Sequence, residues 1–269
     1  MVVGRDRSSG APSYSGFAAD AAIDLIQLPR TRLQQMAEAG REVLNCEAVL
    51  AKTNDTVVGE ILRGQSGFFE WDHYPPGEVH DADSHAHYYY HAHSPEGRDP
   101  DEHGHFHTFI GAAELPAEMR PLPVAGVGPD AGSTGLAHLI AISMNRRGEA
   151  YRLFTTNRWV TGESWYRAKD VILLIDGFTI GHARPSWPAN RWLTAMLRLF
   201  RPQIVHLLEA RDRFLAKWAR DHPGTPVTED RRVEIVTALR ISVPDHLRVI
   251  EGALAQLGPD RIRSVIPDA

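Results

Sequence analysis

The histidines of this chain are concentrated in one short segment. The 269 residues contain 14 histidines, and nine of them lie between residues 73 and 107, where an even distribution would place about two. The nine are His73, His80, His85, His87, His91, His93, His103, His105 and His107. Imidazole is a common ligand of transition metals and the side chain that titrates nearest neutral pH. The composition therefore predicts metal or acid–base chemistry in this segment.

The spacing of these histidines is that of side chains on one face of a strand. Residues i and i+2 of a strand share a face and lie ~6.6 Å apart. Residues 84–93 (SHAHYYYHAH) are rich in aromatic side chains, and residues 103–111 (HGHFHTFIG) alternate in the same way. We expect two antiparallel strands joined by a loop of about nine residues, although a helix over 84–93 would also bring His87 and His91 together.

Two paired rows of histidines could bind one or two transition-metal ions. Rows ~4.8 Å apart, backbone to backbone, let two imidazoles of one strand and one or two of the next surround an ion at ~2.0–2.1 Å. Such nitrogen ligands favour Cu, Fe, Zn or Ni over Mg or Ca, and seven histidines exceed the needs of one tetrahedral ion. The expected ligands are His91, His93, His105, His107, His103, His87 and His85.

The residues around the two rows favour a metal-dependent enzyme that acts on a small molecule. Three consecutive tyrosines, 88–90, adjoin the expected site, and a phenol beside a redox metal can pass electrons or protons. We therefore expect an oxidoreductase, with Tyr89 on the histidine row and Glu102, or a histidine that binds no metal, as the general base. The alternatives are a non-catalytic metal buffer, chaperone or sensor, a loose metal-scavenging tract, and a polar strand face or core network without metal.

Residues 103–109 (HGHFHTF) resemble the H-x-H-x-H-x-x motif of the histidine-triad nucleotide hydrolases and transferases. The resemblance implies that the middle histidine, His105, would attack a phosphoryl group. It covers seven residues, and Gly104 and Thr108 stand where that family has apolar side chains. Phosphoryl transfer without a metal is therefore a further alternative.

A longer set of motifs resembles an uncharacterised bacterial family of unknown function. The motifs are EWDHYPPGEV, YYYHAH, GHFHTF, LFTTNRWVTGE and PSWPANRW, and they fall within residues 60–220. The resemblance implies no activity, but it indicates which histidines are the stronger candidates for metal ligands. His91, His93, His105 and His107 lie inside these motifs, whereas His85 and His87 do not.

The remaining sequence predicts the elements that must position these residues. Apolar spacing predicts a helix over 30–52, and residues 56–80 indicate short strands and loops. Residues 136–144 and 150–156 form a second hairpin pattern, and a helix of about 15 residues is expected after Thr161. Four segments near the C-terminus, 191–200, 202–221, 229–241 and 244–257, are expected to be helical.

Three further polar residues outside the cluster have both a structural and a functional interpretation. His138 lies on an apolar strand face, where a hydrogen-bonded core residue is the simpler reading, but a neighbouring strand could donate it to the site. Arg158 and Glu163, in the NRWVTGE motif, could face a substrate, although a helix cap by Thr161 is the simpler reading there.

Together these patterns predict an α+β fold, in which a small antiparallel sheet carries the histidine cluster between an N-terminal helix and a helical C-terminal half. Residues 1–20 are expected to be a disordered lead-in, followed by a single domain over 21–269 that divides into 21–183, with the histidine sheet, and a helical part, 184–269.

The charge and the cysteine content limit the partners and the location. The formal net charge of −5 argues against nucleic-acid or anionic-membrane binding. No apolar run approaches the ~20 residues of a membrane helix, and the N-terminus does not resemble a signal peptide, so we expect a cytoplasmic protein. The single cysteine, Cys46, excludes an intramolecular disulfide. The oligomeric state is not predicted.

Overall fold

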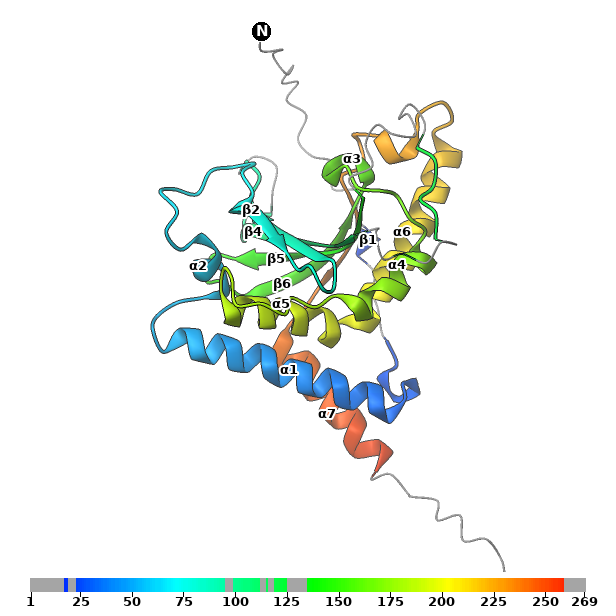
Figure 1. The fold of residues 1–269 in the computed structure, drawn as a ribbon. Coiled ribbons are helices and arrows are strands. Elements are labelled where there is room, and N and C mark those ends of the chain that lie inside the picture. Colours follow the sequence, from blue (N-terminus) through cyan, green and yellow to red (C-terminus); the bar gives the residue numbers. More distant parts are fainter. Residues whose placement is uncertain are drawn as a thin grey trace, which may run out of the picture.

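One seven-stranded sheet forms the centre of the computed structural model, which describes residues 17–18, 23–94, 99–111, 115, 119–124 and 135–258 (Figure 1). The strands lie in the order β1-β7-β6-β5-β4-β3-β2. Their bounds are β1 (Phe17–Ala18), β2 (Tyr74–His80), β3 (Ala86–His91), β4 (Glu102–Gly111), β5 (Leu136–Asn145), β6 (Ala150–Thr156) and β7 (Ile235–Arg240). Strand β1 pairs parallel with β7, and the other pairs are antiparallel. The predicted α+β class is confirmed.

Along the chain, the described α-helices lie between β1 and β2, between β6 and β7, and after β7. They are α1 (Arg30–Ala51), α2 (Val57–Leu62), α3 (Arg158–Thr161), α4 (Ala168–Leu174), α5 (Trp187–Leu199), α6 (Arg201–Asp221) and α7 (Val243–Leu257). Side-chain caps fix several of their starts: Ser186 accepts from the backbone of Ala189 at α5, and Ser242 accepts from Asp245 at α7. No helix in these ranges is long and apolar enough to cross a membrane.

One face of the sheet packs against helices. Tyr88, Tyr90 and Phe106 are almost fully buried there. The Tyr88 hydroxyl donates to Asn190 of α5 at 2.6 Å, and the Phe106 ring meets Trp192, 5.8 Å away between centroids. Helices α1, α5 and α7 lie on this side (Figure 1). Two of the three consecutive tyrosines therefore belong to the core and not to the histidine rows.

The other face of the sheet carries most of the clustered histidines, and we call it the histidine face. Strand register extends it across the sheet: His91 pairs with His105, His105 with Ser143, and Ser143 with Arg152. The adjacent row begins with Tyr89, which pairs with His107. The i, i+2 alternation predicted from sequence is therefore confirmed for β3.

Three expected elements are wrong. Residues 229–241 contain strand β7 instead of a helix, because its successive residues cover the two faces of the sheet. Thr237 donates to the Leu207 carbonyl of α6, and Ala238 packs with Phe154 on the other face. Helix α2 lies in a segment expected to hold only strands and loops, and Thr56 caps it. Thr161 caps no long helix, since α3 ends there and α4 begins only at Ala168.

The expected division at residue 184 separates strands that belong to one sheet. Strand β7, from the C-terminal part, pairs with β6, so one sheet contains strands from both sides of the proposed division at residue 184. Within the expected lead-in, residues 17 and 18 form β1, and the other residues of 1–20 lie outside the described ranges.

A bulge at the start of β4 separates two neighbouring histidines. The register shifts between Glu102 and Gly104. His103 consequently points to the helical face, where its ring stacks on Phe68 at 4.9 Å and its Nδ1 lies 2.7 Å from the Tyr90 hydroxyl. Glu102 instead shares the histidine face with His105. Bulges commonly redirect side chains in this way beside functional sites.

Gly104 makes this bulge possible, and its replacement tests the geometry. A Cβ at this position would lie 2.6 Å from the carbonyl oxygen of His91 and 2.7 Å from the Tyr90 hydroxyl. Gly104→Ala should therefore lower the free energy of unfolding by about 2–3 kcal/mol in urea denaturation. The control, Gly252→Ala on the exposed side of α7, meets no atom within 4 Å and should raise it by about 0.5–1 kcal/mol. Equal effects would contradict the bulge.

Candidate metal centre

Three histidines bring one ring nitrogen each to a common point. His91 ends β3, His93 follows two residues later, and His105 lies on β4. One nitrogen of each ring lies within 4.8 Å of one nitrogen of each of the other two. Nε2 of His91 lies 2.7 Å from Nε2 of His105. Three of the predicted ligands are therefore assembled by one strand pair and the residues that follow it.

Carboxylates orient two of these three rings. Nδ1 of His105 lies 2.8 Å from Oε1 of Glu102, and Nδ1 of His93 lies 3.2 Å from Oε1 of Glu234. A carboxylate that accepts the Nδ1 proton leaves the lone pair on Nε2. Metal-binding histidines almost always have such a partner on their second nitrogen. Glu102 and Glu234 therefore present the two Nε2 atoms in the tautomer that a metal requires.

Burial favours the neutral form of the rings at the centre. His91 and His105 are 6% and 3% exposed. Burial and the neighbouring histidines hold the pKa of His91 well below its ordinary value. Burial also lowers the pKa of His105, although Glu102 opposes that effect. Neutral imidazoles are the form that binds metal ions, so these rings release fewer protons on metal binding than charged rings would.

Several buried ring nitrogens on the histidine face lack a protein partner. Among the described residues, these atoms are Nδ1 of His91, Nε2 of His93, Nε2 of His107 and Nδ1 of His87. A buried polar atom without a partner costs free energy unless a water or an ion satisfies it. Nε2 of His93 is the nitrogen opposite the one that faces Glu234, so it is available to an ion.

Glu102 is held by charge and has little capacity as a base. Its Oε2 accepts from the guanidinium of Arg152, which also donates to Ser143 Oγ at 3.0 Å. Burial alone would raise the pKa of Glu102, but His105 and Arg152 together lower it to about 2. Both carboxylate oxygens have partners, and a group this acidic takes up a proton poorly. Glu102 is therefore better suited to orienting the His105 ring than to the expected role of general base.

Tyr89 is the tyrosine that shares the histidine face with the site. Its ring centroid lies 5.4 Å from that of His91 and 5.2 Å from that of His107. The His73 ring stacks on it at 3.8 Å, and His73 Nδ1 is 2.6 Å from Glu78. Burial raises the pKa of Tyr89 and keeps the phenol protonated. The expected position of Tyr89 beside the histidines is therefore met.

His107 extends the cluster away from the three converging rings. Its Nδ1 lies 3.0 Å from Nε2 of His138, for which the sequence predicts either a core residue or part of the site. Burial lowers the pKa of His138 to about 3. The backbone N–H of His138 donates to Oε2 of Glu163 at 2.6 Å. Glu163 therefore contacts the backbone of His138, and the short helix α3 is capped by Asn157 and not by Thr161.

The other predicted ligands do not join this centre. His103 lies on the helical face, as described above. His85 precedes β3 and has a backbone φ of +54°, outside the strand alternation that defines the row. His87 lies on the histidine face, two residues before Tyr89, and its Nε2 contacts Glu78.

Sequence reasoning missed three side chains at the histidine face. The sequence pattern predicts a helix at Glu234, so it does not predict the approach of Glu234 to His93 across the sheet. Glu78 and His73 lie in a segment with no clear alternation, and only the count of histidines included His73. The EWDHYPPGEV motif, which contains both His73 and Glu78, was the available signal.

An aromatic rim borders the centre where it meets solvent. The Trp71 ring stacks on His93 with centroids 4.5 Å apart, yet Trp71 is 61% exposed. Phe69 nearby is also largely exposed. Trp71 has a φ of +71°, which is an outlier for a bulky side chain and is maintained only where the surroundings enforce it. Its backbone N–H donates to the carbonyl of Ala92.

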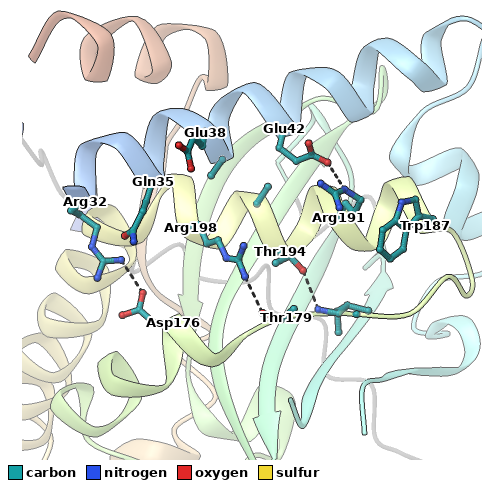
Figure 2. A pocket seen from close by; sticks show the side chains of 14 residues that line it. Arg32, Gln35, Glu38, Glu42, Asp176, Thr179, Trp187, Arg191, Thr194 and Arg198 are labelled. Atoms are coloured by element: carbon teal, nitrogen blue, oxygen red, sulfur yellow. Dashed lines mark hydrogen bonds and ion pairs between the residues drawn. The ribbon is translucent and has the colours of Figure 1, made fainter. Parts of the chain in front are cut away.

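A separate groove of about 760 Å³ lies between α1 and α5 (Figure 2). Four of its charged side chains form two ion pairs: Arg32 contacts Asp176, and Arg191 contacts Glu42. Arg198 donates to Thr179 Oγ1. The groove lacks the converging histidines and does not compete with them as the candidate centre.

Glu163 makes the free energy of unfolding depend on pH. Burial raises its pKa to about 7, from 4.5 when unfolded, so the folded chain holds an extra proton between these values. Stability from this group is therefore full below pH 4.5 and is lost as the pH rises through 7. Glu163→Gln removes this loss. The free energy of unfolding of the variant minus that of the native chain, measured with urea, should therefore rise by about 3 kcal/mol from pH 4.5 to pH 8.

The matched control for this experiment is Glu38→Gln on the exposed side of α1. Its difference from the native chain should stay within about 0.5 kcal/mol at both pH values. A difference for Glu163→Gln that does not grow with pH would contradict the buried, proton-holding carboxyl.

Comparison with known proteins places the sequence in a family and provides no activity. No curated protein and no solved structure matches it. The family match covers residues 37–241, which includes every histidine of the candidate centre and Glu234. The resemblance drawn from the YYYHAH, GHFHTF and NRWVTGE motifs is thereby confirmed. The chain belongs to the family described as a domain of unknown function, DUF6969.

Proposed function

We propose that this chain is a metal-dependent oxidoreductase in which His91, His93 and His105 hold one copper or iron ion. The observation that carries the proposal is the convergence of three imidazole nitrogens, two of them on rings oriented by carboxylates. Three histidine ligands leave further coordination positions for a substrate or water, as in catalytic and unlike fully closed structural sites.

The spacing of the nitrogens fits an ion with little rearrangement. Metal–nitrogen bonds of ~2.0–2.1 Å at a tetrahedral angle place two ligand nitrogens about 3.3 Å apart. The Nε2 atoms of His91 and His105 are 2.7 Å apart, so small rotations of the two rings would suffice. Nitrogen donors of this type suit copper, iron or zinc.

Tyr89 favours redox over hydrolytic chemistry. Its protonated phenol packs against His91 and His107 inside the histidine face. A phenol beside a redox ion can supply an electron and a proton together, a role that a hydrolytic metal site does not need. The ion would supply the redox couple. The chain supplies the oriented imidazoles, the phenol and a largely buried site.

The aromatic rim suggests how a substrate would approach. Trp71 covers one side of His93 and remains exposed, so a flat or apolar small molecule could stack on it and reach the ion beside His93. The strained backbone of Trp71 agrees with a functional position.

The histidine-triad alternative receives less support from the geometry. His103 points to the opposite face from His105 and His107, so the three histidines of this motif do not act on one side of the sheet. Nε2 of His105 also faces His91 and is not directed toward open solvent.

The first test of this proposal is metal content. The untagged chain, purified after growth in metal-replete medium and dialysed, should retain about one copper, iron or zinc ion by elemental analysis. His105→Ala should lose it, and Glu234→Gln should lower the affinity roughly tenfold, because the orienting carboxylate of His93 is gone. His206→Ala on α6 is the control and should retain the ion. Fewer than about 0.2 ions per native chain would contradict the proposal.

The redox step is tested with Tyr89→Phe. The copper-loaded native chain should consume dioxygen in the presence of ascorbate or a simple phenol. Tyr89→Phe should keep the ion but slow the reaction about tenfold or more, because the phenol proton and electron are lost. A native rate no higher than that of His105→Ala under the same metal supply would contradict the oxidoreductase function.

A further inference from the structure

We infer that Glu78, His80 and His87 form a second site for a divalent first-row ion, separate from the three-histidine centre. One ligand atom from each of the three side chains lies within 4.8 Å of the others. The donors are one carboxylate and two imidazoles, a set that binds zinc and leaves a coordination position open.

Strand register brings the two histidines together. His80 on β2 pairs directly with His87 on β3. Their rings stack with centroids 4.0 Å apart and planes 18° apart. Cross-strand partners on one face are the closest neighbours a sheet provides, so this pair is set by the fold and not by chance rotamers.

An irregularity in β2 brings the carboxylate to the same place. The register shifts between Tyr74 and Val79, and Gly77 and Glu78 both have positive φ values, +81° and +59°. Left-handed backbone is uncommon for glutamate and costs of order 1–3 kcal/mol. The result is that Oε2 of Glu78 contacts Nε2 of His87 and lies 4.0 Å from Nε2 of His80.

The contact between Glu78 and His87 is one that a metal ion can take over. The carboxylate and the imidazole share a proton there, and a divalent ion displaces such a proton while binding both atoms. Nδ1 of the buried His87 has no partner among the described residues. The other oxygen of Glu78 stays on Nδ1 of His73, which orients the carboxylate.

The second site is distinct from the first in position and exposure. His87, Tyr89 and His91 stand at i, i+2 and i+4 on one strand face, so His87 and His91 are about 13 Å apart along β3. The two ions of a dinuclear centre lie only ~3.5–4 Å apart. The His80 side chain is 60% exposed and that of Glu78 25%, whereas the other centre is largely buried. The second ion should therefore exchange more readily.

The test is a titration of the full metal-free chain with Zn²⁺ in competition with a chromogenic chelator. The native chain should bind two ions, one tightly and one more weakly. His80→Ala, at an exposed position that folding tolerates, should weaken the second event at least tenfold and leave the tight one unchanged. His206→Ala, the matched histidine control, should change neither event.

The variants separate this inference from the proposed function. His105→Ala should abolish the tight event and keep the weaker one. A single event that only His105→Ala removes would overturn the second site and leave the proposed centre standing. A single event in the native chain that only His80→Ala removes would support the second site and contradict the proposed centre. Titrations of the native chain and His80→Ala that coincide would also overturn the inference.

Discussion

Imidazoles can be buried beside one another only while they are neutral, and the histidine face is built around this constraint. Burial lowers the pKa of His91, His105, His107 and His138. A neutral ring still has one donor and one lone pair to place. Glu102 fixes the proton of His105, and Arg152 balances the charge of Glu102. The Nε2 atoms of His91 and His105 meet at 2.7 Å in a hydrogen bond, and a metal ion can displace the proton between them.

The backbone departs from regular strands where this arrangement needs it. The β4 bulge places Glu102 next to His105 and sends His103 to the other face. The β2 irregularity turns Glu78 toward His87. Further register shifts occur near Thr108 of β4, Ser143 of β5 and Thr155 of β6. The left-handed backbone at Glu78, with its φ of +59°, lies where a carboxylate meets a histidine.

The sequence predicts the histidine face well and its supporting groups poorly. Strict alternation placed His87, His91, His105 and His107 correctly, because a strand period of two leaves no other arrangement. The same rule failed for His103, since one inserted residue reverses the face. Glu234 could not be found, because its approach to His93 depends on long-range pairing of β7, a segment whose short amphipathic pattern also fits a helix. The α+β class follows from local patterns alone.

X-ray absorption at the metal edge tests the central claim most directly. The chain would be loaded with one equivalent of Cu²⁺ or Zn²⁺, in the His80→Ala background so that only the buried centre is occupied. The account predicts a shell of nitrogen neighbours at about 2.0–2.1 Å with the multiple scattering of three imidazoles. His105→Ala should reduce that imidazole scattering. A shell of oxygen neighbours without imidazole scattering, unchanged in His105→Ala, would contradict the account.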